Sequence, residues 1–174
     1  MLRKKRSSGF SLIELLIGIV ILSILAAIAV PSFKVWLENS QIRNAAEAAL
    51  NGMQRARAEA VSRNATVEFV LGTGTSWKVN VIGGASNPID SRASSEGSPN
   101  VTSTVTPAGA TTVTFNSLGS ITTNADSSAS ITQIQFDSSV LPPADSQELR
   151  VTIGLGGNLK MCDPNAPTSS PRAC

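Results

Sequence analysis

Residues 10–30 read FSLIELLIGIVILSILAAIAV, a run of 21 residues in which Glu14 carries the single charge. As a helix this run would extend ~31 Å, about the thickness of the hydrocarbon core of a bilayer. A short basic segment precedes it, MLRKKRSSG, in which four residues are Lys or Arg. Basic residues favour the cytoplasmic side, so the pattern predicts a membrane-crossing helix with its N-terminus inside and the residues after Val30 outside.

Two other interpretations of the run stay open at this point. A cleaved secretory signal would place small residues after its apolar region, and Ala26, Ala27 and Ala29 have that position. A plain single-span anchor needs no further feature. Glu14 fits neither well, because a carboxylate at mid-membrane costs ~2.5–3.5 kcal/mol and an intramembrane carboxylate is by default a functional residue.

Residues 9–14, GFSLIE, resemble the processing site of type IV pilins and pseudopilins. The resemblance implies that a prepilin peptidase cuts between Gly9 and Phe10 and that the new N-terminal Phe10 is methylated. It also gives Glu14 a partner, a positive N-terminal amine of its own or a neighbouring subunit. Such a pair would offset the desolvation of both charges and set the axial register of a subunit in a filament.

The resemblance implies a division of the chain into four parts. These are a leader peptide (1–9), a transmembrane and filament-core helix (10–30), an amphipathic stalk helix (31–64) and a periplasmic β-rich head (65–174). The implied partners are other major or minor pilins or pseudopilins, the prepilin peptidase and an inner-membrane assembly platform. The implied location is the bacterial inner membrane, as a single-pass protein, and after assembly the tip of a pilus or pseudopilus.

A helical stripe of small and apolar residues follows Pro31. Its members recur at spacings of four and three: Ile42, Ala46, Ala49, Met53, Ala56 and Ala60. Leu50 and Val61 are expected to widen this stripe, and the opposite, charge-rich face is expected to be solvated. We therefore predict one helix over residues 10–63, with a bend at Pro31, which removes a backbone donor, and an end at Asn64.

Beyond residue 64 the apolar pattern alternates with a period of two, which is typical of strands. The predicted strands cover residues 66–71, 77–82, 112–116, 131–136, 149–153 and 159–162. Glycine-containing turns at 72–75 and 154–157 predict hairpins, and the second lacks the Lys of a phosphate loop. Residues 83–109 hold three prolines and predict a long loop with one short strand near 101–105.

Two cysteines, Cys162 and Cys174, enclose a segment with three prolines near the end of the chain. In an oxidising periplasm two lone cysteines are expected to pair, although free thiols or a redox role stay open. Closing a loop of this size contributes roughly 3 kcal/mol in the chain-entropy model and would hold a terminus that otherwise frays.

The composition excludes several classes of enzyme. The chain has no His, which rules out Ser-His-Asp and Cys-His arrangements and any His-bearing zinc site. Two cysteines cannot complete a four-cysteine zinc site, and we expect no enzymatic activity, metal or cofactor. The basic excess, 14 Lys and Arg against 12 Asp and Glu, comes from the four basic residues of the first nine positions. Residues 10–174 have ten basic and twelve acidic residues, a net charge of −2.

Further segments resemble the GspH/FimT family: residues 44–47, residues 55–64 before the first strand, residues 115–119 (FNSLG) and the hairpin at 150–157. This family includes pseudopilin H of type II secretion and minor pilins of the FimT and FimU kind. The implied fold is α+β and type IV pilin-like, with a long N-terminal helix packed on a small antiparallel β-sandwich and a C-terminal disulfide loop. The first functional hypothesis is a minor pilin that primes or caps a type IV pilus, and the alternative is a secretion pseudopilin.

A third hypothesis is a DNA-binding pilin for transformation. Some FimT proteins bind DNA through a C-terminal Gly-Arg-x-Arg pattern. The matching residues here, 157–160, read GNLK and so lose the first Arg and replace the second by Lys. The remaining candidates for a weak DNA contact are Arg150, Lys160 and Arg172, in a body whose net charge allows few phosphates to be neutralised.

Overall fold

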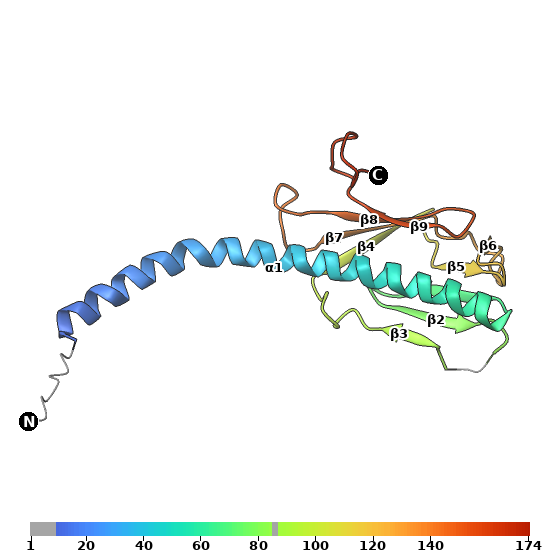
Figure 1. Ribbon diagram of the computed structural model, residues 1–174, viewed down its shortest axis with the longest axis horizontal. Coiled ribbons are helices and arrows are strands. Elements are labelled where there is room, and N and C mark those ends of the chain that lie inside the picture. Colours follow the sequence, from blue (N-terminus) through green and yellow to red (C-terminus); the bar gives the residue numbers. More distant parts are fainter. Residues whose placement is uncertain (1–9, 85–86) are drawn as a thin grey trace, which may run out of the picture. The chain divides into compact units, whose positions relative to one another are not determined.

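The computed structural model describes residues 10–84 and 87–174, which divide into two compact units on either side of the boundary between Trp36 and Leu37. The helix α1 (Leu12–Arg63) supplies most of the first unit and enters the second (Figure 1). Its bounds lie within two residues of the predicted ones, and the helix continues through Pro31. The predicted leader, residues 1–9, lies outside the described residues.

All nine strands of the described chain belong to the second unit. A five-stranded antiparallel sheet has the order β3-β2-β1-β5-β6, and a four-stranded antiparallel sheet has the order β4-β7-β8-β9. The strands are β1 (Val67–Leu71), β2 (Trp77–Val81), β3 (Asp90–Arg92), β4 (Val101–Thr106), β5 (Thr112–Phe115), β6 (Ile121–Thr122), β7 (Gln133–Ser138), β8 (Leu149–Ile153) and β9 (Leu159–Cys162). Both predicted hairpins, β1–β2 and β8–β9, are confirmed.

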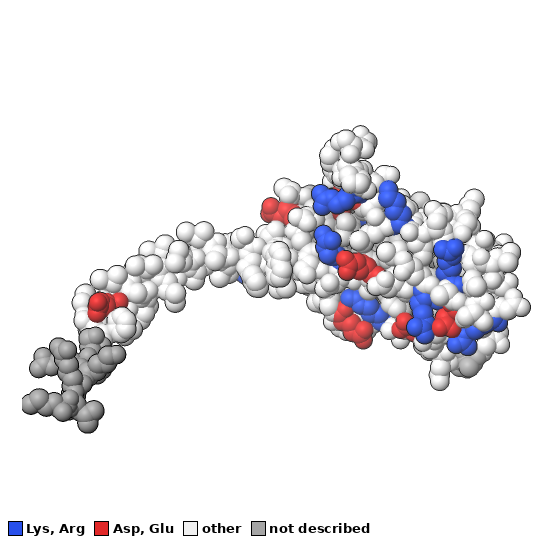
Figure 2. All heavy atoms as spheres, viewed as in Figure 1, with Lys and Arg blue, Asp and Glu red and all other residues white. Residues whose placement is uncertain are grey.

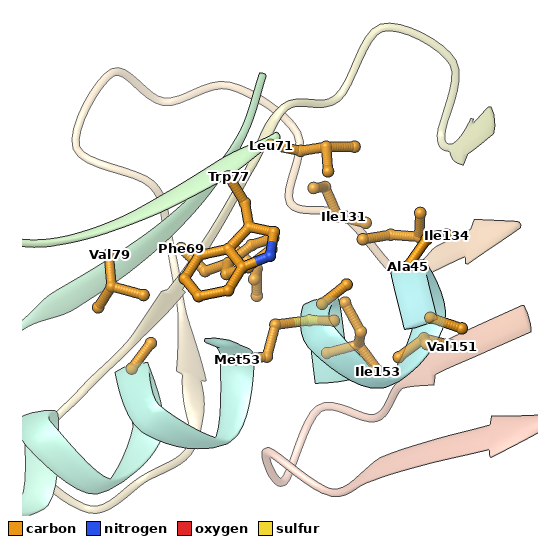
Figure 3. Packing of buried hydrophobic residues seen from close by; sticks show 14 of the residues in the cluster. Ala45, Met53, Phe69, Leu71, Trp77, Val79, Ile131, Ile134, Val151 and Ile153 are labelled. Carbon is orange, nitrogen blue, oxygen red and sulfur yellow. The ribbon is translucent and has the colours of Figure 1, made fainter. Parts of the chain in front are cut away.

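One hydrophobic core joins α1 to both sheets. The predicted stripe is buried throughout, from Ile42 to Ala60, with each member at most 1% exposed. Figure 3 shows Met53 of α1 between Phe69 and Trp77 of the five-stranded sheet and Val151 and Ile153 of the four-stranded sheet. The alternation of buried residues along β1 and β7 turns one face of each sheet toward this core. The predicted α+β fold, with the helix packed on antiparallel sheets, is confirmed.

The helix ends where expected. Asn64 adopts a positive φ of 48°, a conformation that Asn tolerates better than most residues, and the amide of Ala65 donates to the carbonyl of Ala60 at 3.1 Å. The charge-rich face of α1 is solvated, as predicted. On it Glu59 accepts hydrogen bonds from Arg63 and Arg55, and the Arg63 bond holds the pKa of Glu59 below its ordinary value.

The width of the buried stripe was predicted wrongly at Val61. Its side chain is 52% exposed, whereas Leu50 packs partly against the core. Val61 lies beside the turn at Gly119, where a Cβ on that glycine would be 3.2 Å from Cγ2 of Val61, and this turn leaves half of the Val61 side chain exposed. In that turn the Gly119 carbonyl accepts from Nε of Arg57 at 3.1 Å.

Three strand predictions also need correction. Residues 83–109 contain the predicted short strand, β4, but also β3, whose polar residues Asp90–Arg92 gave no alternating signal. Strand β6 was not predicted, because two residues are too few to show an alternating pattern. The strand predicted at 131–136 instead covers Gln133–Ser138, because Ile131 donates its amide to Thr112 of the other sheet and so connects the two sheets.

Candidate assembly site at the start of the N-terminal helix

The first half of α1 presents an apolar surface on every side. Its thirteen Leu, Ile and Val residues between Leu12 and Val30 are each 51–79% exposed within the chain. The segment is long and apolar enough to cross a membrane. So large an exposed apolar surface is stable only when lipid or other apolar surfaces cover it. This segment is therefore a membrane anchor, a surface for packing against other helices, or both in turn.

Glu14 takes part in a capping box at the N-terminal end of this surface. Its Oε2 accepts a hydrogen bond from the amide of Ser11 at 2.9 Å, while Oγ of Ser11 accepts one from the amide of Ile13 at 3.2 Å. The two side chains thereby satisfy amides at a helix end that have no partner within the helix. The first turn of a helix also favours a negative charge through the helix dipole.

Sequence reasoning singled out Glu14 but missed Ser11. The signal was present, because Ser-x-x-Glu directly before an apolar run is the sequence pattern of a capping box. Glu14 is exposed and forms no ion pair with any residue in the described part of the chain. The cap therefore holds its charge in place, and no residue within 10–84 and 87–174 neutralises it. Phe10, the expected N-terminus after processing, is 93% exposed.

The helix interior supplies the other predicted feature of this segment, Pro31. The helix continues without a break on both sides of Pro31. The bend expected at Pro31 stays a prediction. Ser23 satisfies its hydroxyl within the helix by donating to the carbonyl of Ile19 at 2.7 Å. Because a bound hydroxyl costs less in an apolar medium than a free one, Ser23 is compatible with a buried or membrane position.

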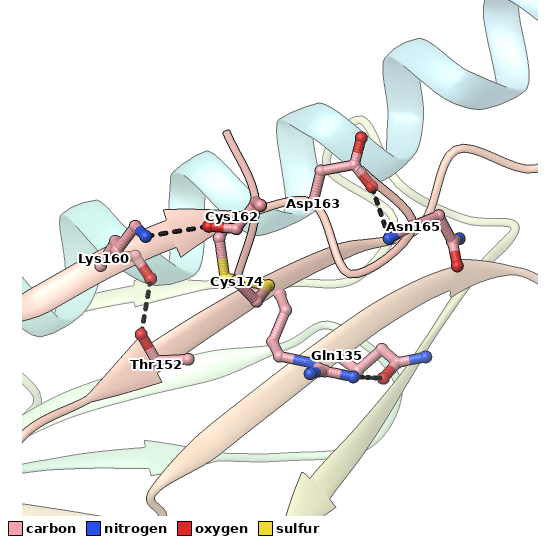
Figure 4. The surroundings of a disulfide bond; sticks show 9 residues. Gln135, Thr152, Lys160, Cys162, Asp163, Asn165 and Cys174 are labelled. Atoms are coloured by element: carbon pink, nitrogen blue, oxygen red, sulfur yellow. Dashed lines mark hydrogen bonds between the residues drawn. A yellow bond between two sulfur atoms is a disulfide. The ribbon is translucent and has the colours of Figure 1, made fainter. Parts of the chain in front are cut away.

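The predicted disulfide between Cys162 and Cys174 is present and closes a C-terminal loop (Figure 4). The loop is fastened at its base by the amide of Asp163, which donates to the carbonyl of Arg172 at 2.7 Å. Lys160 adds a hydrogen bond from its Nζ to the carbonyl of Ala173 at 2.9 Å. The end of the chain is thereby tied to the edge strand β9.

The three predicted DNA-contact residues lie on or beside strands β8 and β9, and two of them form hydrogen bonds within the head. Arg150 donates to Oε1 of Gln135 at 2.9 Å, and Lys160 bonds the Ala173 carbonyl. Only Arg172 keeps its side chain without a hydrogen bond to the described residues. A DNA contact at Arg150, Lys160 and Arg172 stays a prediction. No group of three His, Cys, Asp or Glu residues within residues 10–84 and 87–174 is placed to hold a metal ion.

Two protein-family models match the chain. Residues 45–165 match the family described as type II transport protein GspH, and residues 4–30 match the prokaryotic N-terminal methylation motif. The first match covers most of the chain and the whole sequence of strands. The chain belongs to the GspH family.

The fold of this GspH-family chain also matches solved structures of the type IV minor pilin FimU from Pseudomonas aeruginosa strain PAO1. One crystal form gives a TM-score of 0.52 at 19% identity, covering 80% of this chain and 98% of the crystallised FimU chain. A second gives 0.50 at 18% identity, covering 76% and 98%. The likeness establishes the pilin fold, and both family and fold are those of structural subunits. The methylation motif and the apolar helix together point to membrane anchoring.

Three of the four segments that resemble the GspH/FimT family, those that hold Arg57, Gly119 and Gly157, meet at one place in this fold. The turn at Gly119, the β8–β9 turn at Gly157 and the side chain of Arg57 lie in contact. A Cβ on Gly157 would lie 2.0 Å from the Gly119 carbonyl oxygen and 3.4 Å from Nε of Arg57. These segments are far apart in sequence, and their shared contact gives a physical reason for the pattern.

Removing the disulfide should loosen the C-terminal loop. In the Cys162→Ser variant we expect proteinase K to cleave within residues 163–174 at least several times faster than in the wild type, because the loop then loses a constraint worth roughly 3 kcal/mol. Mass spectrometry of the digest measures this. Cys174→Ser removes the same bond and should behave identically, and the core around Trp77 should keep its fluorescence. Equal cleavage of wild type and both variants would contradict the role given to the bond.

Proposed function

We propose that this GspH-family chain is a minor pilin, a structural subunit that primes or caps assembly of a type IV pilus. The observation that carries the proposal is the uncovered apolar helix that ends in the Ser11–Glu14 capping box. Before assembly the bilayer covers this helix, and the head lies in the periplasm. During assembly a bundle of like helices replaces the lipid.

Processing before the helix, rather than after it, is what makes this exchange workable. Cleavage between Gly9 and Phe10 leaves the apolar segment attached and creates an amine beside the capping box. Glu14 is held by the cap and has no ion-pair partner in the part of the chain that the structure describes, so it is available to the amine of a neighbouring subunit's first residue. A buried carboxylate and amine tolerate desolvation only as a pair, and the pairing would therefore fix one axial position for each new subunit.

Two observations favour the pilus over the secretion machine. The fold covers nearly all of the crystallised chain of FimU, a type IV minor pilin, and the disulfide-closed segment of residues 162–174 resembles the C-terminal segments of minor pilins. The family description, type II transport protein GspH, favours the second candidate, a pseudopilin of type II secretion. Both candidates depend on the same N-terminal helix and on its processing by a prepilin peptidase, and they differ in the filament that the subunit joins.

Deletion of the gene separates the two candidates. For a minor pilin we expect surface pili and twitching motility to fall to a few per cent of wild type while secretion of folded enzymes continues. Electron microscopy of sheared cells, a twitching assay and the enzyme activity of the culture supernatant measure this. Complementation in trans is the control for polar effects. Loss of enzyme secretion with normal pili would contradict this proposal and favour a pseudopilin of type II secretion.

A further inference from the structure

A cavity of about 190 Å³ lies in the second unit beside the disulfide loop. Helix α1, the segment before β8, strand β9 and the loop all contribute to it. Its lining residues are Asn39, Arg43, Gln147, Leu149, Met161, Cys162, Asp163, Pro171 and Arg172. At ~30 Å³ for each water this volume holds roughly six waters, which is the size of one side chain rather than of a helix.

The charged lining of this cavity stands apart from the other arginines of the chain. Seven arginines lie in residues 10–84 and 87–174, and five of them hydrogen-bond through their guanidinium groups: Arg55, Arg57, Arg63, Arg92 and Arg150. The other two, Arg43 and Arg172, make no such bond to the described residues, and no described carboxylate lies within 4 Å of either. Both line the same cavity, one from α1 and one from the disulfide loop.

The remaining polar groups of the lining are mostly occupied. Asn39 donates to the carbonyl of Asp145 at 2.9 Å and accepts from the amide of Gln147 at 2.8 Å. Asp163 accepts from the amide of Asn165 at 2.9 Å (Figure 4). Leu149, Met161 and Pro171 add apolar surface. The cavity therefore offers two free guanidinium groups together with apolar walls.

We propose that this cavity receives the side chain of an aspartate or glutamate from the head of a neighbouring pilin-like subunit. The inference rests on the proposed function, because it assumes that the chain packs beside other pilin heads. Guanidinium groups bind carboxylates through paired, charge-assisted hydrogen bonds, and two unengaged arginines on different elements supply more donors than one carboxylate needs. The apolar walls suit the methylene stem of such a side chain.

A phosphate of DNA fits the same cavity less well. The carboxylate of Asp163 also lines it, and residues 10–174 carry a net charge of −2, which opposes a polyanion. Figure 2 shows acidic and basic side chains interspersed over the face of the head that it draws, with no continuous basic stripe. A single carboxylate would contact only the two guanidinium groups. A DNA strand would also bring further phosphates close to the acidic residues of the head.

The test uses the full chain in cells that assemble filaments. The photo-crosslinking residue p-benzoylphenylalanine replaces Gln147, whose side chain makes no hydrogen bond to the described residues. We expect an adduct with a pilin-like subunit, at a peptide that contains Asp or Glu. The charge reversals Arg43→Glu and Arg172→Glu should each lower the adduct at least tenfold, and Asp or Glu→Arg at the mapped partner position should restore it. Lys78→Glu, the same charge change on an exposed residue of β2, is the matched control and should leave the adduct unchanged.

Several results would overturn the inference. These are an adduct that survives both charge reversals, an adduct with lipid or nucleic acid, and no adduct in a chain that is present in sheared filaments. Arg43→Gln and Arg172→Gln keep the size of the side chains and serve where a reversal disturbs folding, as judged by protease resistance. Absence of the chain from all filaments would instead reject the proposed function, and this inference with it.

Discussion

Replacing Gly157 by Ala is expected to destabilise the head by about 3 kcal/mol or more. Gly157 has a φ of +76°, a conformation that costs an L-residue ~1–2 kcal/mol. The new Cβ would also lie 2.0 Å from the Gly119 carbonyl oxygen, a backbone atom that cannot rotate away. Separating the two turns adds ~1–3 kcal/mol of the kind seen on overpacking, and it removes the acceptor of Arg57.

Two neighbouring substitutions make this prediction specific. Gly119→Ala should cost less, about 1–2 kcal/mol. Its φ is also positive at +75°, but its Cβ would meet side chains rather than backbone, Nε of Arg57 at 3.0 Å and Cγ2 of Val61 at 3.2 Å. Gly156→Ala should stay within ~0.5 kcal/mol, since no atom lies within 4 Å of its Cβ. Urea unfolding of the full chain in micelles, followed by Trp77 fluorescence in a Trp36→Phe background, measures all three. Equal midpoints for the Gly157 and Gly156 variants would show that the two turns do not touch.

The contact between these turns also shows what sequence reasoning can reach. The helical stripe and the hairpins follow from periodicity and turn residues, which are local properties, and both were predicted closely. The closeness of Gly119 and Gly157 depends on how two sheets pack around one helix. No local pattern encodes that distance. Gly157 was interpreted as a turn residue and Gly119 only as part of a family resemblance, and their contact was missed.

In the candidate site, too, the residues that belong to a local sequence pattern could be predicted and the contacts that depend on the fold could not. Glu14 was found because a charge in an apolar run conflicts with its surroundings, and such a conflict is visible in sequence. Ser11 belonged to a local pattern that was present but overlooked. Arg172 was named from the sequence as a candidate DNA contact, but nothing in the sequence linked it to Arg43. The two arginines come from the helix and from the disulfide loop and line one cavity only in the folded head.

Replacing Glu14 by Ala is expected to leave membrane insertion intact and to lower incorporation into filaments by on the order of a hundredfold or more. Insertion should persist because the change only makes the segment more apolar. Incorporation should fall because the amine of a neighbouring subunit would then be buried without its partner. Removing one member of a buried ion pair costs ~3–5 kcal/mol, and each 1.4 kcal/mol is a factor of ten. Immunoblots of sheared filaments against membranes give the incorporated fraction.

Two further variants separate the charge of Glu14 from its role in the cap. Glu14→Gln keeps an oxygen that can accept from the Ser11 amide but removes the charge, and it should assemble as poorly as the Ala variant. Ser11→Ala removes the hydroxyl that accepts from Ile13 and costs ~1 kcal/mol of helix capping, yet it keeps the charge and should assemble within about tenfold of wild type.

The opposite order of these two variants would change the mechanism. If Glu14→Gln assembled normally while Ser11→Ala failed, filament growth would depend on an ordered helix start and not on a carboxylate–amine pair. The expected order follows from magnitudes. A lost cap leaves amides that water or headgroups can still reach, whereas a lost carboxylate leaves a full charge in an apolar helix bundle, where nothing else in the first turn can neutralise it.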